Sequence, residues 1–183
     1  MSQRIPRLSA QDLVPELREM LGPKMDRLGY LGEFFQCTAH QPQVLMSFIT
    51  LTEELKQALP NQLTEVVALS VAALLKNDYE RVQHERLSLK LGFGEPWVRD
   101  VLSLQPEGRS SLGQEDRLVQ KLVIAVVRKN GHDSGQELEE VISATGHEKA
   151  VAVLMLIGRY VMHALIANCL NLAPPVPSPL EKA

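Results

Sequence analysis

The sequence contains little cysteine, few aromatic residues and no excess of positive charge. Cys37 and Cys169 are its only cysteines in 183 residues, too few for a disulfide framework or a thiolate zinc site. Lysine and arginine number 19 against 22 aspartates and glutamates, and the formal net charge is −3. Because a nucleic-acid-binding protein usually carries a basic surplus, we expect no nucleic acid partner. With 45% hydrophobic residues the chain can bury a sizeable core, which argues against disorder.

The chain also lacks a clear membrane or export signal. No apolar run follows its first charged residues, so it does not resemble a secretory signal. The most apolar stretch, residues 150–172, is long enough to span a bilayer. Arg159, His163 and Asn168 interrupt it, and a central arginine alone costs about 3 kcal/mol in a bilayer. We therefore expect a buried helix, no membrane partner and a cytoplasmic protein.

Apolar residues recur at three- and four-residue steps through most of the chain, which predicts helices. Four expected helices begin at Pro42, after an N-cap at Asn61, at Tyr79 and at Glu95, and three more cover residues 114–130, 134–144 and 148–172. Cys37 lies on a further amphipathic segment. These patterns predict an all-α, single-domain helical bundle of about seven to eight helices. It spans residues 1–183, with an N-terminal arm (1–9) and a proline-rich tail (173–183) that is mobile or draped over a neighbour.

A weak internal repeat relates residues 59–77 to residues 112–130 at an offset of 53. At this offset Glu65 corresponds to Leu118, and His84 corresponds to Glu137. A site built on Glu65 and His84 would therefore belong to the first copy only.

The polar residues of the segment between residues 63 and 92 suggest chemistry. Glu65 lies in an almost entirely apolar helix, and Glu80 and His84 are four residues apart on the next one, hence on one face. If the two helices pack antiparallel, Glu65 approaches that face. Two carboxylates and an imidazole in an apolar crevice form a plausible proton-transfer unit. The same residues also fit a solvated helix pair in which Arg81 and Arg86 neutralise the acids.

Glu65 and the stretch Tyr79-Glu80-Arg81-Val82-Gln83-His84 resemble the carboxymuconolactone decarboxylase/alkylhydroperoxidase D-like superfamily. The signature of that family is an acid in one helix, followed by C-x-x-C-x-x-x-H or Y-E-x-x-x-H at the start of the next. The resemblance implies the all-α bundle of the alkylhydroperoxidase D-like (AhpD-like) type, no cofactor and no metal. It also implies a homo-oligomer: a hexamer built as a trimer of dimers, or a trimer or dimer.

The resemblance assigns Glu65, Glu80 and His84 as catalytic residues. His84 would be the general acid/base, and Glu65 would orient it or relay its proton. Tyr79 and Glu80 would shape the pocket, and Arg81 would bind the substrate together with Tyr79. A second arginine, Arg159, is an alternative cation for an anionic substrate, whereas we expect His163 to be a satisfied core or interface residue.

The chain departs from the peroxidase branch of the family at both thiol positions. That branch has cysteines seven and four residues before the histidine, where this sequence has Asn77 and Glu80. Thiol-based peroxide reduction at this site therefore lacks its nucleophile. Cys37 and Cys169 are expected to be core residues.

Three functions remain open. The favoured one is a carboxymuconolactone decarboxylase-like lyase or isomerase that performs acid/base chemistry on a small carboxylate or lactone. The second is a peroxiredoxin- or alkylhydroperoxidase-like antioxidant protein, which the missing C-x-x-C disfavours. The third is a non-catalytic oligomer that binds a small ligand. The substrate itself is not named by the sequence.

Overall fold

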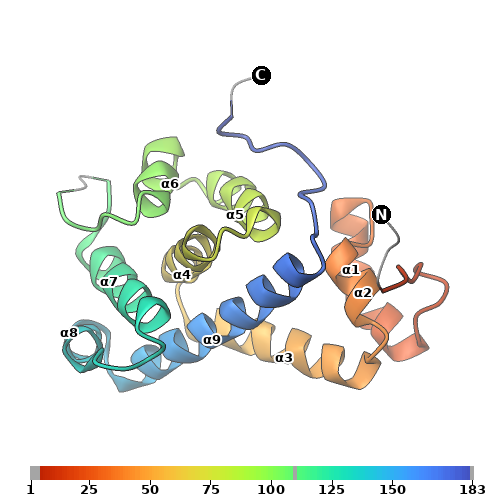
Figure 1. The fold of residues 1–183 in the computed structure, drawn as a ribbon, viewed down its shortest axis with the longest axis horizontal. Helices are drawn as coiled ribbons and strands as arrows, with labels where there is room; N and C mark the ends of the chain where they lie inside the picture. The colour runs from red at the N-terminus through yellow and green to blue at the C-terminus, as the bar shows by residue number, and fades with distance from the viewer. Residues whose placement is uncertain (1–4, 109–110, 182–183) are drawn as a thin grey trace.

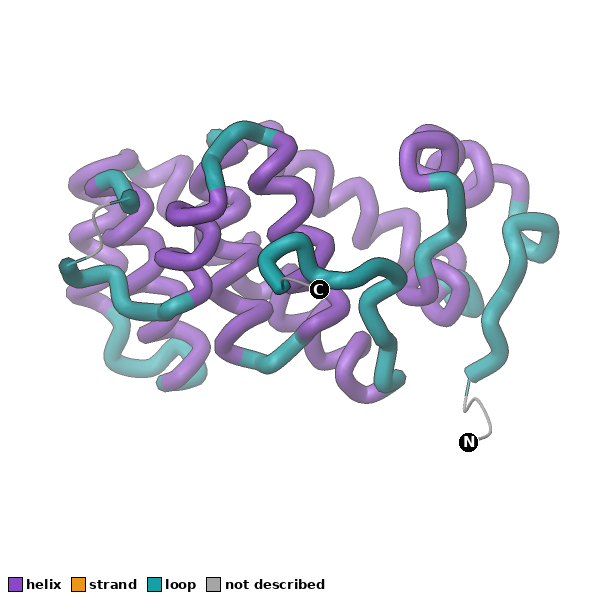
Figure 2. Tube along the Cα trace, turned by 90° about the horizontal axis from the view of Figure 1, so that it is seen from above, coloured by secondary structure: helices purple, strands orange, loops and turns teal. Residues whose placement is uncertain are grey.

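The computed structural model describes residues 5–108 and 111–181, and every regular element within these ranges is a helix (Figure 2). The helices are, in chain order, α1 (Pro15–Leu28), α2 (Glu33–Thr38), α3 (Pro42–Ala58), α4 (Asn61–Leu74), α5 (Asp78–Lys90), α6 (Glu95–Leu102), α7 (Gln114–Arg128), α8 (Gly135–Thr145) and α9 (His147–Cys169). The predicted all-α class is confirmed. Residues 1–4 of the expected arm and 182–183 of the expected tail lie outside the described ranges.

The described residues form nine helices rather than seven to eight, because α1 carries a poor sequence signal. Its interior contains Gly22 and Pro23, two residue types that disfavour the middle of a helix. Tertiary packing overrides this preference, since Leu17 and Leu21 of α1 are buried. The helix ends at Gly29, whose φ of 79° is a left-handed conformation that glycine adopts without strain.

Helix α4 lies at the centre of the larger part of the molecule, packed against α5, α6, α7 and α9 (Figure 1). Every residue of α4 from Leu63 to Ala72 is buried. A helix that is apolar on all sides is stable only when it is covered on all sides, and this explains its central position. Glu65 belongs to this buried stretch, so its carboxyl group needs partners inside the protein.

The repeat is visible as two helix pairs. Helices α4 and α7 begin 53 residues apart, at Asn61 and Gln114, and they pack against each other. Each is followed by a turn with positive-φ residues: Lys76 (φ 52°) before α5, and Asn130 (φ 53°), Gly131 (φ 81°) and Asp133 (φ 49°) before α8. The cluster discussed below lies in the first pair.

Helix α9 runs through the molecule beside α3 and α4 (Figure 1). Its length and composition would suit a membrane span, but half of its apolar window is buried, as in the core helix of a soluble protein. Its outer face exposes four large apolar side chains: Val151, Met155, Met162 and Leu165. Cys169 at its end is exposed, contrary to the core position expected for it, whereas Cys37 is buried.

The end of the expected proline-rich tail makes contacts with its own chain. After α9 this C-terminal segment passes between α5 and the α1–α2 end of the molecule (Figure 1). Ser178 Oγ donates a hydrogen bond to the fully buried Glu85 (2.5 Å). Arg99 binds the backbone carbonyl of Leu180 at 2.9 Å. These contacts place Pro179 at the edge of the cavity described next.

Candidate active site

The packing of α4 against α5 brings Glu65 and His84 into contact. His84 Nδ1 lies 2.8 Å from Glu65 Oε2, and Ser88 Oγ donates to the same oxygen at 3.1 Å. Glu65 is 2% exposed and His84 is 8% exposed. The Glu65 carboxyl is thus satisfied by two side chains of α5, one of which also reaches a cavity.

Glu80 lies on the other side of the His84 ring. Its Oε2 atom is 3.6 Å from His84 Nε2, 3.5 Å from Arg159 Nη1 and 3.1 Å from His163 Nδ1. Burial disfavours the ionised carboxyl, but His163, His84 and Arg159 outweigh it and hold the pKa of Glu80 well below its usual range. Glu80 is therefore ionised at neutral pH.

His84 is protonated at neutral pH. Burial alone would lower its pKa, but Glu65 and Glu80 outweigh that effect and raise the pKa of His84 to about 9. As an imidazolium it carries two N–H groups, and its Nδ1–H donates to Glu65. Its Nε2–H lies on the Glu80 side of the ring, so the ring holds one proton on each carboxyl side.

His163 belongs to this site, which corrects the expectation of a satisfied core histidine. It lines the cavity, and its ring centroid lies 3.8 Å from that of Phe34. Burial lowers the pKa of His163 to about 3, so the ring is neutral at neutral pH and carries a positive charge only in the acidic range where Glu80 itself titrates. Within the described residues, neither of its nitrogens has a hydrogen-bond partner in good geometry, despite the short distance to Glu80. A lone histidine on a long apolar helix offered no sequence signal for this position.

Arg159, rather than Arg81, is the arginine that lies beside Glu80. Its Nε donates to Thr52 Oγ1 at 3.0 Å, and its guanidinium lies 4.2 Å from the Tyr160 ring centroid. Its buried Nη1 has no hydrogen-bond partner among the described residues. This atom faces Glu80 Oε2 at 3.5 Å, and the guanidinium as a whole lines the cavity.

Arg81 was expected to bind the substrate, but its side chain does not line the cavity. Its guanidinium binds Glu85 at 2.6 Å and Asp78 at 2.9 Å. Glu85 is fully buried and needs a cation, and Arg81 is one helical turn before it. Arg81 is thus paired with Glu85, on the face of α5 that contacts the C-terminal segment.

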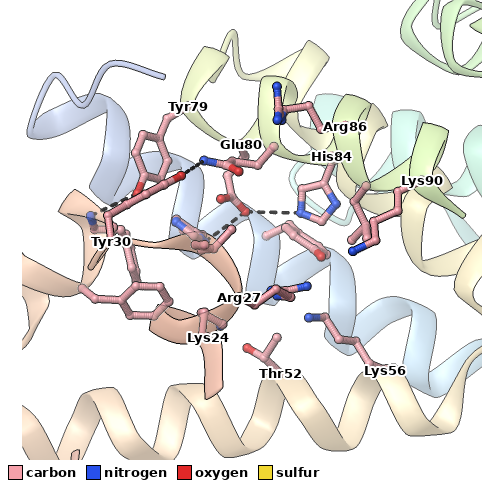
Figure 3. A pocket seen from close by; sticks show the side chains of 18 of the residues that line it. Lys24, Arg27, Tyr30, Thr52, Lys56, Tyr79, Glu80, His84, Arg86 and Lys90 are labelled. Carbon is pink, nitrogen blue, oxygen red and sulfur yellow. Dashed lines mark hydrogen bonds and ion pairs between the residues drawn. The ribbon is translucent and has the colours of Figure 1, made fainter. Parts of the chain in front are cut away.

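The cavity measures about 530 Å³, within the range of small-molecule sites (Figure 3). Tyr79, Glu80 and His84 all line it. The Tyr79 hydroxyl accepts a hydrogen bond from the backbone N–H of Phe34 at 3.3 Å, and burial raises the pKa of Tyr79 above its usual range. Tyr79 therefore stays a neutral phenol. Lys24 and Lys56 also line the cavity, and sequence reasoning missed them because it could not place α1 and α3 beside α5.

No thiol and no metal cluster accompanies these groups in the described residues. Neither Cys37 nor Cys169 lines the cavity, and burial raises the pKa of the Cys37 thiol. Within the described ranges, no group of three or more histidine, cysteine, aspartate or glutamate side chains has the arrangement of a metal site.

Solved structures share this architecture. A peroxidase-related protein from Ralstonia eutropha JMP134 with an AhpD core superposes with a TM-score of 0.79 over 93% of this chain and 91% of its own. This chain has the AhpD-like fold. The apo debrominase Bmp8 superposes with a TM-score of 0.81, covering 95% of this chain and 93% of that one. A protein of unknown function from Agrobacterium tumefaciens has a TM-score of 0.67 over 76% of this chain and 96% of its own.

These likenesses concern the AhpD-like fold alone, because the sequences are only 14–17% identical. No protein-family model and no curated protein matches the sequence. The resemblance found in the Tyr79–His84 stretch is confirmed at the level of the fold. One neighbour is a debrominase and another has a peroxidase-related description, so the AhpD-like fold does not by itself select one activity.

Proposed function

We propose that this protein is a carboxymuconolactone decarboxylase-like enzyme that decarboxylates or isomerises a small carboxylate or lactone by cofactor-independent acid/base chemistry. The observation that supports this is the His84 ring, held between Glu65 and Glu80 at the wall of a cavity. Its pKa of about 9 makes it a proton donor at neutral pH. A positioned general acid accelerates such a reaction by about 10²- to 10⁴-fold.

In the decarboxylation, the bond between the carboxylate and its neighbouring carbon breaks and CO₂ leaves. The electron pair stays on that carbon, and the Nε2–H of His84 protonates it, forming a C–H bond. Neutral His84 then takes a proton from water, which restores the imidazolium, and the hydroxide left behind combines with the released CO₂ as bicarbonate. Glu65 keeps the ring oriented through Nδ1–H, and the guanidinium of Arg159, which lines the cavity, binds the anionic group of the substrate. Tyr79 contributes its neutral hydroxyl to the cavity wall.

Two alternatives remain, each with an observation against it. An antioxidant hydroperoxidase would need a reactive thiol, but Asn77 and Glu80 occupy the positions of the motif's cysteines, and neither cysteine lines the cavity. A purely binding protein would not need a buried proton donor between two acids, because such a group is costly to bury.

The deciding experiment is a screen of small carboxylates and lactones for CO₂ release or isomer formation, on the wild type and on His84→Gln. Turnover of one compound by the wild type, lost in His84→Gln while thermal-shift binding persists, supports the proposal. Binding without turnover in the wild type favours the binding protein. Peroxide consumption that disappears in the Cys37→Ser/Cys169→Ser variant favours the antioxidant function instead.

The assembly and cellular location expected from the sequence also remain proposals. A homo-oligomer is supported by the apolar outer face of α9, formed by Val151, Met155, Met162 and Leu165.

A further inference from the structure

The cavity concentrates positive charge in a protein that is acidic as a whole. The chain has a net charge of −3, whereas Glu80 is the one acidic residue among the described residues that line the cavity. Six lysine and arginine side chains line it: Lys24, Arg27, Lys56, Arg86, Lys90 and Arg159. A concave site lined by charges of one sign attracts ligands of the opposite sign.

Besides the buried Arg159, two of these cations are less exposed than the others. Lys24 on α1 and Lys56 on α3 are half-buried, whereas Arg27, Arg86 and Lys90 are exposed. Figure 3 shows Lys24 and Lys56 on the α3 side of the cavity, across from Glu80 and His84 on α5.

Lys24 lacks a compensating acid. It forms no ion pair with a described residue, and its Nζ lies 4.7 Å from the Phe35 ring centroid. Burial, and then the neighbouring charge of Lys56, lower the pKa of Lys24 to about 8, although Glu53 acts in the opposite direction. Lys56 has only an ion pair with Glu53 at 3.6 Å, and Glu53 is exposed. A half-buried lysine beside other cations is stabilised when an anion lies between them.

The remaining wall of the cavity is aromatic. All three tyrosines of the chain, Tyr30, Tyr79 and Tyr160, line it together with Phe34 and Phe35. Five of the eight aromatic residues in the sequence thus surround one cavity. Such a wall suits a flat, partly apolar molecular body.

We propose that Lys24 and Lys56 form an anion-binding subsite for a second acidic group of the substrate. The ligand is then a flat organic molecule with at least two negative charges, carried by carboxylate or phosphate groups. One acidic group binds the Arg159 guanidinium beside His84, and the other lies between Lys24 and Lys56. This orientation rests on the proposed function, because it places the reacting carbon at His84.

Calorimetric titration of the full chain at neutral pH tests the subsite with three probes: benzoate, isophthalate and phenyl phosphate. We expect isophthalate or phenyl phosphate to bind about tenfold or more tightly than benzoate, the effect of one added charge-assisted contact. Lys24→Gln and Lys56→Gln should remove most of that preference while leaving benzoate binding nearly unchanged. Lys121→Gln, on α7 and away from this cavity, is the matched control that removes the same charge.

Equal binding of benzoate and the two doubly charged probes overturns the subsite, as does unchanged affinity in Lys24→Gln and Lys56→Gln. The absence of any binding of the doubly charged probes overturns it as well. Whichever of isophthalate and phenyl phosphate binds more tightly shows whether the subsite prefers a carboxylate or a phosphate group. His84→Gln separates this proposal from the catalytic one: it should keep the preference for double charge even if no compound is ever turned over. Circular dichroism melting of each variant shows that its fold is retained.

Discussion

His84 Nδ1 lies 2.8 Å from Glu65 Oε2, and this contact joins the most buried helix of the protein to the wall of its cavity. Glu65 is 19 residues before His84 in the chain, so only the packing of α4 on α5 brings the two together. Because Glu65 is inaccessible and His84 reaches the cavity, the acid acts on any ligand through the imidazole.

Replacing Glu65 by glutamine should lower the pKa of His84 from about 9, because Glu65 contributes most to raising it. Glutamine keeps a hydrogen-bonding oxygen for the ring, so the fold should survive. A histidine-detected NMR titration measures the midpoint directly, with Glu54→Gln on the exposed side of α3 as control. An unchanged midpoint in Glu65→Gln would show that the contact does not set the protonation of His84.

The stability of the protein should fall with rising pH because of His84. The folded pKa, about 9, lies above the reference value of 6.5, so the folded state binds the proton more tightly than the unfolded state. The resulting stabilisation is fully present below about pH 6.5 and is lost as pH rises through about 9. Lys24 acts in the opposite direction above about pH 8, since its folded pKa is lowered.

Urea unfolding across this range, compared between wild type and His84→Gln, isolates the histidine because both proteins contain Lys24. The difference in unfolding free energy between them should shrink toward pH 9. A difference that is constant with pH would contradict the raised pKa.

Arg159→Gln should destabilise the protein, because it removes the permanently charged side chain that lies 3.5 Å from the buried carboxylate of Glu80. Removing one partner of a buried ion pair typically costs about 3 kcal/mol, and the 3.5 Å separation of this pair places the cost at or below that figure. The double variant Arg159→Gln/Glu80→Gln should recover part of the loss. Chemical denaturation of the three variants forms a double-mutant cycle, and strictly additive losses would show that the two side chains are not coupled.

Lysine at Met155 and Leu165 should dissociate the proposed homo-oligomer. Both side chains are more than half exposed on the outer face of α9, where two buried charges would be intolerable in an interface. Light scattering coupled to size-exclusion chromatography gives the mass of the wild type and of the double variant. Gln136→Lys on α8 adds a charge elsewhere on the surface and should leave the mass unchanged. A monomeric wild type at tens of micromolar would remove the basis for the interface.

Local sequence patterns predicted most of the helices. The helix starts at Pro42, Asn61 and Glu95 follow from proline, asparagine and periodic apolar residues, all of which act within one or two turns. Such signals are absent from α1, where Gly22 and Pro23 oppose the helix and only packing of distant residues supports it. The C-terminal segment was unpredictable for the same reason, since its partner Glu85 is 93 residues away from Ser178.

By itself, the sequence determined the helical class, the repeat and the candidate trio of Glu65, Glu80 and His84, because helical spacing places the last two on one face. Only the tertiary structure decided which cations join them. In the folded protein Arg81 binds the buried Glu85 instead of lining the cavity. Lys24, Lys56 and Arg159, from three other helices, line the cavity. Spacing along one helix is set by local geometry, whereas the meeting of four helices depends on how their buried faces pack.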